Sequence, residues 1–297
     1  MKLRIGTRKS PLALAQANEV AQKLRQAWPG LECELVHIMT SGDQFVDRSL
    51  ADIGGKGLFT KEIEEALLAR TIDIAVHSMK DMPTQLPDGL LISSMLERED
   101  VRDVLVGHNI GTIADMPQGA SFGTSSLRRS AQLLMIRPDL RIVPLRGNVQ
   151  TRLAKIEQGE MHATMLAAAG LNRLGLKHVP GAPLPIEQFL PAVAQGAIGI
   201  ECREDDVKTR ELLQPLAHQA TMQAVEIERA FLRALDGSCR MPIAGYARIE
   251  TGKAHFKGLV LTADGVKSYA DEGAYAIGEA IAAAADLGKS LAARLKN

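Results

Sequence analysis

The chain has 297 residues, of which 46% are hydrophobic and 24% charged, as is typical of a soluble globular protein of two or three domains. Lysine plus arginine and aspartate plus glutamate number 35 each, so the formal net charge is zero and no nucleic-acid partner is expected. No stretch reaches membrane-spanning length, and the N-terminal residues lack the apolar core of a signal peptide. These features predict a cytoplasmic protein with no membrane partner.

The three cysteines and seven histidines are scattered and show no metal-ligand spacing, so no metal site is expected. Cys202 ends an apolar run and is expected to be a buried, unreactive thiol.

Strands and helices alternate over the first third of the chain. Ser10 precedes Pro11, a pattern typical of a helix N-cap followed by proline at the first helical position. The glycine-rich loop Gly54–Gly57 holds Lys56 but lacks the Lys-Ser/Thr pair of a P-loop, so it is a weak nucleotide signal and a candidate mobile cover. The pattern predicts strands over Leu3–Gly6 and Leu35–Met39, and a helix from Thr60 to Arg70.

The segment that follows is the first candidate for chemistry. Asp73–Val76 is predicted to be a short buried strand, and His77, Lys80 and Asp81 follow it before Pro83 prevents a regular continuation. Ligands of open α/β sheets bind beyond the carboxyl ends of strands. The segment is therefore either a site or an ordinary strand exit in which polar residues meet water.

A second set of elements begins after the charged break Glu97–Asp100. Strands are predicted over Leu90–Met95, Val101–Val106, Arg141–Leu145 and Ala163–Ala168, with a helix over Thr151–Gln158. Gly123-Thr-Ser-Ser126 leads into a helix whose first turn holds Arg128 and Arg129, against the preference of the helix dipole for acids. Either the two arginines share an anionic ligand, or they are solvated surface residues.

Arginines recur just past predicted strand ends in this neutral chain. They are Arg8, Arg128, Arg129, Arg146 and Arg173, with Arg152 one turn further into its helix. Because the planar guanidinium suits bidentate pairing with carboxylates and phosphates, the pattern predicts one cleft lined for several anionic groups.

The last third of the chain is predicted to contain a strand over Ala192–Glu201, helices over Met222–Leu235 and Ala276–Leu295, and strands over Ile243–Ile249, His255–Leu261 and Val266–Tyr269. Its one chemical feature is Cys239 on a small loop. No histidine lies near it in sequence as a partner base, so the thiol is either incidental or an attachment point rather than a hydrolase nucleophile.

Together these residues resemble the hydroxymethylbilane synthase family, also called porphobilinogen deaminases. The matching pieces run in family order over roughly the first 245 residues: Thr7–Leu14, Gly54–Phe59, His77–Pro83, Gly123–Arg129, Leu145–Asn148, Thr151–Leu153, Leu190–Ala197 and Gly237–Ile243.

The resemblance implies an enzyme that joins four porphobilinogen molecules into linear hydroxymethylbilane with release of ammonia. It implies a dipyrromethane cofactor held by a thioether to Cys239, and Asp81 as the catalytic acid. The residues it implies for cofactor and substrate binding are Arg8, Ser10, Lys56, Lys80, Thr124, Ser126, Arg128, Arg129, Arg146, Gly147, Arg152, Arg173 and Gln195. A monomer is expected, and His77 is expected to be structural.

The implied fold is α/β with three domains. Two are similar periplasmic-binding-protein-like lobes with mixed, mostly parallel sheets, formed by residues 1–97 with 197–215 and by residues 98–196, which close by hinge motion. The third is a smaller α+β C-terminal domain over residues 218–297, which carries the cofactor. Ala194 and Ser238 stand where the family commonly has glycines; the change at Ala194 is expected to be harmless.

Two other classes compete with this reading. A bilobed anion-binding module would use the same arginines without needing Asp81 or Cys239. A nucleotide or phosphate-ester enzyme would use Gly54–Gly57 and would bind ATP or Mg²⁺.

Overall fold

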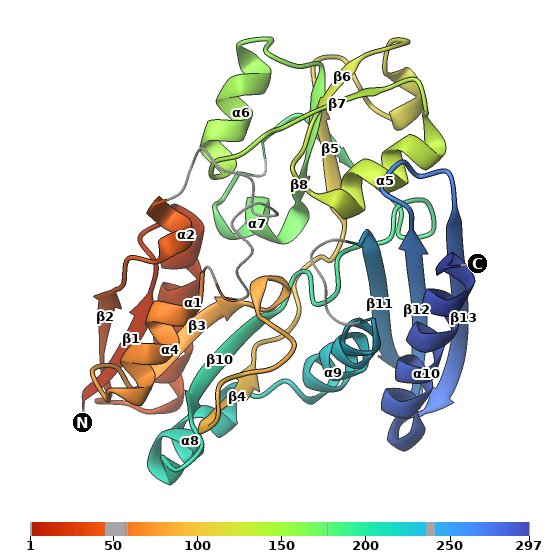
Figure 1. Cartoon of the computed structure of the whole chain (residues 1–297). Helices are drawn as coiled ribbons and strands as arrows, with labels where there is room; N and C mark the ends of the chain where they lie inside the picture. The colour runs from red at the N-terminus through yellow and green to blue at the C-terminus, as the bar shows by residue number, and fades with distance from the viewer. Residues whose placement is uncertain (1, 45–56, 58, 177, 236–240, 297) are drawn as a thin grey trace. The chain divides into compact units, whose positions relative to one another are not determined.

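The computed structural model describes residues 2–44, 57, 59–176, 178–235 and 241–296 (Figure 1). The chain forms two compact units. Unit 1 is Met1–Arg98 with Gly196–Met222, and unit 2 is Glu99–Gln195 with Gln223–Asn297. The C-terminal segment therefore belongs to the same compact unit as residues 99–195, and the division into three domains stays a prediction.

Unit 1 is built on a mixed five-stranded sheet with the order β2-β1-β3-β10-β4. Strand β1 is parallel to β2 and β3, whereas β10 is antiparallel to both β3 and β4. The elements of this unit are β1 (Lys2–Thr7), α1 (Pro11–Ala27), β2 (Glu32–His37), α2 (Ser41–Gln44), α4 (Lys61–Leu68), β3 (Ile74–Ser78), η1 (Met79–Asp81), β4 (Leu90–Met95), β10 (Ile198–Arg203), α8 (Val207–Leu213) and η3 (Gln214–Leu216).

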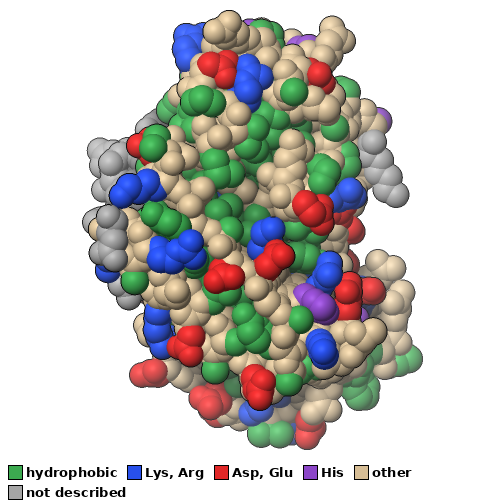
Figure 2. Space-filling view, turned by 90° about the vertical axis from the view of Figure 1, so that its right-hand side faces the viewer, with side chains coloured by type: hydrophobic (Ala, Val, Ile, Leu, Met, Phe, Trp, Pro, Cys, Tyr) green, Lys and Arg blue, Asp and Glu red, His purple; other side chains and the backbone are tan. Residues whose placement is uncertain are grey.

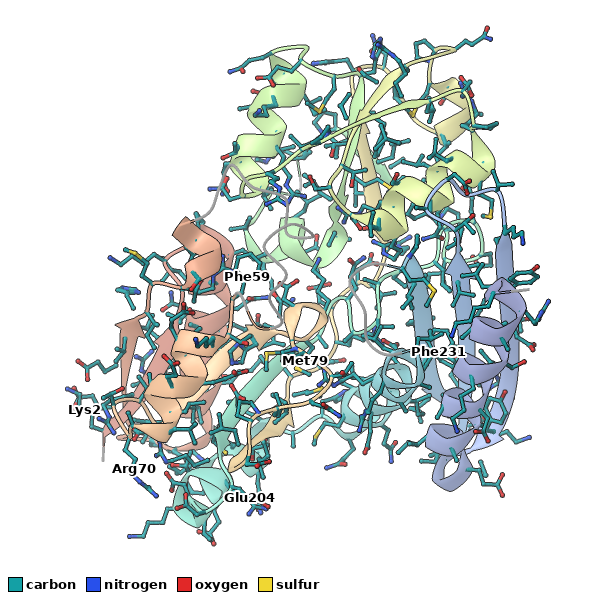
Figure 3. All side chains as sticks on the ribbon, in the orientation of Figure 1. Lys2, Phe59, Arg70, Met79, Glu204 and Phe231 are labelled. Carbon is teal, nitrogen blue, oxygen red and sulfur yellow. The ribbon has the colours of Figure 1, made fainter. Side chains whose placement is uncertain are left out.

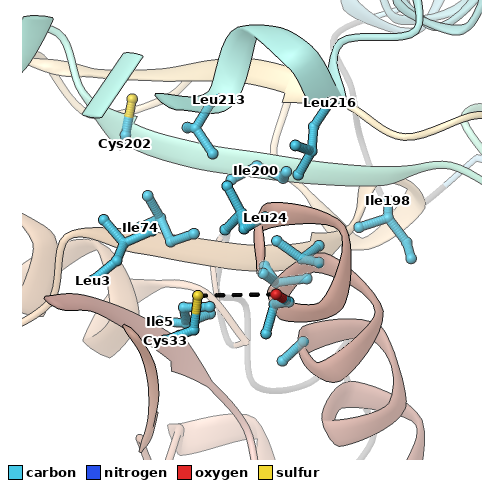
Figure 4. Close-up of a cluster of buried hydrophobic side chains, with 14 of the residues drawn as sticks. Leu3, Ile5, Leu24, Cys33, Ile74, Ile198, Ile200, Cys202, Leu213 and Leu216 are labelled. Carbon is cyan, nitrogen blue, oxygen red and sulfur yellow. Dashed lines mark hydrogen bonds between the residues drawn. The ribbon is translucent and has the colours of Figure 1, made fainter. Parts of the chain in front are cut away.

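Side-chain alternation along the strands separates two cores in unit 1. On β3, Ile74 and Val76 point into the larger core beneath α1, which Figure 4 shows together with Ile198 and Ile200 of β10. The alternate position, Ala75, packs on the other face against α4. Both faces of the central strands are thus covered, as expected for a sheet whose strands are nearly continuous apolar runs.

Unit 2 repeats this sheet order with the strands β7-β6-β8-β5-β9. Strand β6 is parallel to β7 and β8, and β5 is antiparallel to β8 and β9, so β5 takes the place that β10 has in unit 1. The elements are β5 (Asp103–Gly107), η2 (Ile113–Asp115), β6 (Ser121–Gly123), α5 (Leu127–Ile136), β7 (Arg141–Val143), α6 (Val149–Glu157), β8 (Ala163–Ala167), α7 (Ala168–Arg173) and β9 (Gly181–Pro183).

The C-terminal part of unit 2 is a smaller antiparallel sheet, β11-β12-β13, with α10 against β12 and β13 (Figure 1). Phe231, labelled in Figure 3, packs edge-to-face on Phe256 with ring centroids 5.2 Å apart. The elements are α9 (Gln219–Ala234), β11 (Ile243–Glu250), β12 (Lys253–Leu261), β13 (Ser268–Ala276) and α10 (Ile277–Lys296). With two mixed sheets and this smaller domain, the predicted α/β class is confirmed.

The surface agrees with the balanced composition. On the face shown in Figure 2, acidic and basic side chains are interspersed among the residues that the structure describes. None of the helices in the described ranges is long and apolar enough to cross a membrane.

Several predicted strand boundaries are wrong. Strand β2 spans Glu32–His37 rather than Leu35–Met39, and β13 spans Ser268–Ala276 rather than Val266–Tyr269. Two further differences have a physical reason in the structure. Strand β10 begins at Ile198 rather than at residue 192, because Ala194 and Gly196 have left-handed backbones, with φ of 61° and 88°, that a strand cannot contain. Strand β3 continues through His77 to Ser78, because β10 pairs with it up to Ser78. The short elements α2, α7 and β9 were not predicted from the sequence.

A buried glutamate fixes the segment that precedes β10. Glu228 on α9 is fully buried, and its carboxylate accepts hydrogen bonds from the backbone N–H groups of Ala194 at 2.5 Å and of Ala247 on β11 at 2.7 Å. Those contacts hold Ala194 in a conformation that costs an L-residue roughly 1–2 kcal/mol. The alanine is therefore not the harmless replacement for glycine that the sequence suggested.

We expect Ala194→Gly to raise the free energy of unfolding by roughly 0.5–1 kcal/mol. The gain is smaller than the relieved strain because glycine also increases the entropy of the unfolded chain. Denaturant unfolding would measure it, with Ala284→Gly inside α10 as the control, which should instead lose about 1 kcal/mol. Equal losses at both positions would contradict the assignment of strain to Ala194.

Candidate active site

One pocket of unit 1 lies at the carboxyl edge of its sheet. Strands β1 and β3 are parallel neighbours, so Arg8, just after β1, and Asp81, just after β3, come to the same edge. The residues that line the pocket are Arg8, Ser10, Leu12, Ala13, Gln16, Phe59, Thr60, Ile63, Val76, His77, Ser78, Asp81 and Met82. The strand exit singled out in the sequence therefore opens into a pocket, and we call it the Asp81 pocket.

The turn that carries Asp81 is anchored beneath it. Met79, labelled in Figure 3, is 1% exposed, and its N–H donates to the carbonyl oxygen of Ala197 at 3.0 Å. Gly199 leaves room for its sulfur in this position: a Cβ on residue 199 would lie 2.1 Å from the Met79 Sδ atom. Asp81 itself is exposed. The fold thus presents a solvent-accessible carboxylate on a fixed turn, which suits a group that must meet a substrate.

Arg8 is held in place by two residues that the sequence analysis did not assign to the site. Its Nε donates to both carboxylate oxygens of Asp43 at 3.1 Å, and the guanidinium lies 4.3 Å from the ring centroid of Phe59, labelled in Figure 3. Burial would raise the pKa of Asp43, but the hydrogen bonds from Arg8 and Thr40 outweigh it and lower that pKa. Arg8 is therefore oriented, and its charge is partly balanced before any ligand binds.

Polar side chains of α1 and β3 also line the pocket, and Glu201 of β10 lies behind them. The Gln16 amide of α1 donates to the Ser78 hydroxyl at 2.8 Å, and His77 Nε2 lies 2.9 Å from Glu201 Oε2. The Ser10 hydroxyl accepts a hydrogen bond from the N–H of Ala13 at 3.4 Å, which confirms its predicted N-cap position. Ser10 thus starts α1 and also faces the pocket.

In unit 2, Arg128 and Arg129 surround a buried carboxylate. Each arginine is 6% exposed, and they pair with the fully buried Asp103 at 2.8 and 2.6 Å. Gln195 Nε2 donates to Asp103 Oδ1 at 3.2 Å and to the Val101 carbonyl oxygen at 2.8 Å. Burial would raise the pKa of Asp103, but the two guanidiniums hold it well below its usual range. The alternative of solvated surface arginines is therefore wrong.

The sheet topology explains why Asp103 reaches these arginines. Strand β5 is antiparallel to β8, and its first residue, Asp103, pairs with Ala167 at the carboxyl end of β8. Strand β6 is parallel to β8, so α5, which follows β6, begins at that same edge. The Asp103 carboxylate therefore offsets the unfavourable interaction between the two arginines and the positive end of the α5 dipole. Two guanidiniums share this one carboxylate, so the cluster keeps an excess of positive charge.

The Arg146–Asn148 turn uses a glycine that its geometry requires. Gly147 has φ of 109°, and a Cβ there would lie 2.8 Å from the Thr151 Cγ2 atom. Arg152 Nε donates to the Gly147 carbonyl oxygen at 2.9 Å. Arg146 is half-buried and has no hydrogen-bond or ion-pair partner among the described residues. This turn therefore holds one arginine as a brace and leaves another available for an anion.

The remaining predicted site residues are placed as follows. Thr124 is buried and its hydroxyl accepts from the N–H of Ser126, which in turn caps α5 through the N–H of Arg129. Lys80 is exposed beside Asp81, and Arg173 ends α7. Lys56 and Cys239 lie outside the described residues, so their predicted roles stay predictions.

The two described cysteines are both buried, as predicted for Cys202. Burial raises the pKa of Cys202 to about 11 and also raises that of Cys33, so neither forms a thiolate readily. The described residues contain no group of three or more histidine, cysteine, aspartate or glutamate side chains arranged to hold a metal ion.

Comparison with known proteins shows to which family the chain belongs. Residues 3–211 match the family described as porphobilinogen deaminase, dipyromethane cofactor binding domain, and residues 222–297 match porphobilinogen deaminase, C-terminal domain. The chain belongs to the porphobilinogen deaminase family. The resemblance proposed from the sequence motifs is thus confirmed.

Porphobilinogen deaminases from two bacteria and a plant match 90% or more of the chain. The protein of that name from Nitrobacter winogradskyi is 51% identical over 98% of this chain and 92% of its own length. That from Paracoccus denitrificans is 51% identical over 98% of this chain and 94% of its own length. The chloroplastic porphobilinogen deaminase of Oryza sativa is 52% identical over 90% of this chain and 76% of its own length.

Proposed function

We propose that the protein is a hydroxymethylbilane synthase, which condenses four porphobilinogen molecules into hydroxymethylbilane with water and releases four molecules of ammonia. The observation that carries the proposal is the Asp81 pocket, where a fixed, exposed carboxylate and a braced arginine share one sheet edge in a chain of this family. Each porphobilinogen carries an acetate, a propionate and an aminomethyl group, so the site must provide cations for the side chains and an acid for the reacting ring.

Asp81 acts on the reacting ring. Its carboxylate accepts a hydrogen bond from the pyrrole N–H, and its negative charge stabilises the positive charge that develops on the ring as the C–N bond breaks and ammonia leaves. Groups that act in this way on a transition state contribute about 10²–10⁴-fold to the rate. Because η1 is anchored through Met79, the carboxylate needs little reorganisation during the step.

The described residues fit a dipyrromethane cofactor, which carries four carboxylates of its own and supplies a pyrrole carbon to which the first substrate is joined. Arg146 has no hydrogen-bond or ion-pair partner among the described residues, and within that part of the chain Arg128 and Arg129 share a single carboxylate, that of Asp103. Cations that are not fully neutralised match a poly-carboxylate ligand. The residues proposed to hold cofactor and substrate are Arg8, Ser10, Lys56, Lys80, Thr124, Ser126, Arg128, Arg129, Arg146, Gly147, Arg152, Arg173 and Gln195.

The attachment of the cofactor through a thioether to Cys239 has a direct test. Intact-mass measurement of the freshly purified protein should show an adduct of two pyrrole units, and Cys239→Ser should lack it. Cys202→Ala is the control and should keep the adduct, because that thiol is buried and its pKa is raised to about 11. An unmodified thiol in active protein would overturn the proposal and leave an anion-binding module as the alternative.

Three finer points belong to the same proposal: action in the cytoplasm, a monomeric state, and the three-domain division. Sedimentation of the purified protein would test the monomer.

A further inference from the structure

Three buried titratable side chains meet behind the wall of the Asp81 pocket. Glu64 of α4, His77 of β3 and Glu201 of β10 are 7%, 6% and 0% exposed, and we call them the Glu64–His77–Glu201 cluster. Strand β10 pairs with β3 so that Glu201 lies opposite Ala75 and Gly199 opposite His77. Side-chain alternation then turns Ala75, His77 and Glu201 to the face that α4 covers.

One hydrogen bond joins two members of the cluster, and one oxygen of each carboxylate is unpaired among the described residues. His77 Nε2 lies 2.9 Å from Glu201 Oε2, whereas Glu201 Oε1 and Glu64 Oε1 have no hydrogen-bond partner among the described residues. The nearby buried cation, Arg203, is already engaged by Asp206 at 2.7 Å and by the carbonyl oxygens of Leu67 and Ile72. Two buried carboxylates with one imidazole near them do not both stay ionised without a large cost.

The two acids of the cluster have different surroundings. Burial raises the pKa of Glu64; the Thr60 hydroxyl and His77 oppose this, and Glu201 and Glu65 add to it. Glu201 Oε2 instead has a direct partner, the Nε2 atom of His77 at 2.9 Å, whereas Glu64 Oε1 has none among the described residues. Of the two acids, Glu201 is therefore the one placed to accept a hydrogen bond from the imidazole.

The cluster reaches the pocket through one member. His77 belongs to the pocket lining together with Ser78 and Asp81, whereas Glu64 and Glu201 do not. Any effect of the two acids on a bound ring must therefore pass through the orientation and protonation of His77.

We propose that Glu201 is a positioning residue for the reaction: its ionised carboxylate accepts a hydrogen bond from His77 Nε2–H and so fixes the tautomer and orientation of the imidazole in the pocket wall, while Glu64 is a neutral acid. The kinetic part of this inference rests on the proposed function. Its spectroscopic part concerns the free protein alone.

The wild-type protein gives the first test without any substitution. In ¹⁵N NMR spectra at neutral pH, His77 Nε2 should have the chemical shift of a protonated nitrogen. An unprotonated Nε2 would overturn the proposal. Because this measurement needs no turnover, it stands even if porphobilinogen proves not to be the substrate.

Glu201→Gln supplies the kinetic test. The amide keeps the size of the side chain but removes the charge that selects the Nε2–H tautomer, so kcat should fall about 10-fold, as small misplacements at a reacting centre do. KM should change less than threefold, the pH profile of kcat should shift, and the His77 ¹⁵N signals should show a changed tautomer. Glu211→Gln at an exposed position of α8 is the control and should change none of these. An unchanged His77 spectrum and pH profile would reduce Glu201 to a structural residue.

The stability of Glu64→Gln tests whether Glu64 is protonated. This test does not depend on whether Glu201→Gln folds. A carboxyl whose pKa is raised on folding lowers stability progressively as pH rises above its unfolded value of 4.5. The melting temperature of Glu64→Gln relative to wild type should therefore increase as pH is raised from 4.5. A constant or falling difference would show that Glu64 is ionised and would overturn the proton assignment.

Discussion

Asp81→Asn is expected to lower kcat about 10²–10⁴-fold with the fold intact. Asparagine keeps the shape of the side chain but removes the negative charge proposed to stabilise the ring as ammonia leaves. Because Asp81 is exposed and Met79 anchors its turn, the melting temperature should stay within about 1 °C of wild type. Ammonia release under saturating porphobilinogen would measure the effect.

Asp88→Asn is the matched control for this experiment. Asp88 is also exposed in the segment after β3 but does not line the Asp81 pocket, so its loss should change kcat less than twofold. Near-normal turnover by Asp81→Asn would remove Asp81 from the mechanism. The adduct on Cys239 would then still identify the cofactor and leave the catalytic acid to be found elsewhere.

Asp103→Asn is expected to cost roughly 3–5 kcal/mol of the free energy of unfolding. The substitution leaves two guanidiniums, each 6% exposed, without the carboxylate that they share. The substitution also alters the side chain that accepts a hydrogen bond from Gln195 Nε2. Denaturant unfolding followed by circular dichroism would measure the loss.

The pH dependence of this loss distinguishes Asp103 from Glu64. A carboxyl whose pKa is lowered on folding contributes stability above its unfolded pKa, near 3.9, and loses it only as pH falls through the folded value. The difference between Asp103→Asn and wild type should thus be constant from about pH 5 to pH 8.

Asp286→Asn is the control for Asp103→Asn. It breaks an exposed pair with Lys289 and should cost less than about 1 kcal/mol. A similarly small loss at Asp103 would mean that Arg128 and Arg129 do not depend on its carboxylate.

Local signals in the sequence located much of the candidate site. Ser10 and Ser126 cap the helices that begin at the next residue, and Pro83 follows the turn that holds Asp81. These features depend on neighbours within a few residues, since a cap or a strand exit involves only the backbone beside it. The order of the family motifs added the catalytic role that is proposed for Asp81.

The same local reasoning failed where backbone conformation depends on distant contacts. The small-residue run before β10 fits a buried strand by composition alone, yet Glu228 on α9 holds Ala194 in a left-handed conformation. The predicted Val101–Val106 strand contains Asp103, but nothing in that pattern says that its carboxylate faces two arginines.

The sequence by itself determined which chemical groups the protein places at its strand ends, because caps, turns and strand exits are encoded by adjacent residues. The tertiary structure alone decided which of those groups are already paired. His77 meets Glu201 across 124 positions, and Arg129 meets Asp103 across 26, through the antiparallel strands β10 and β5 that join each sheet beside parallel ones. A pattern of period two gives the face of a strand, but its partner and register follow only from the packed sheet.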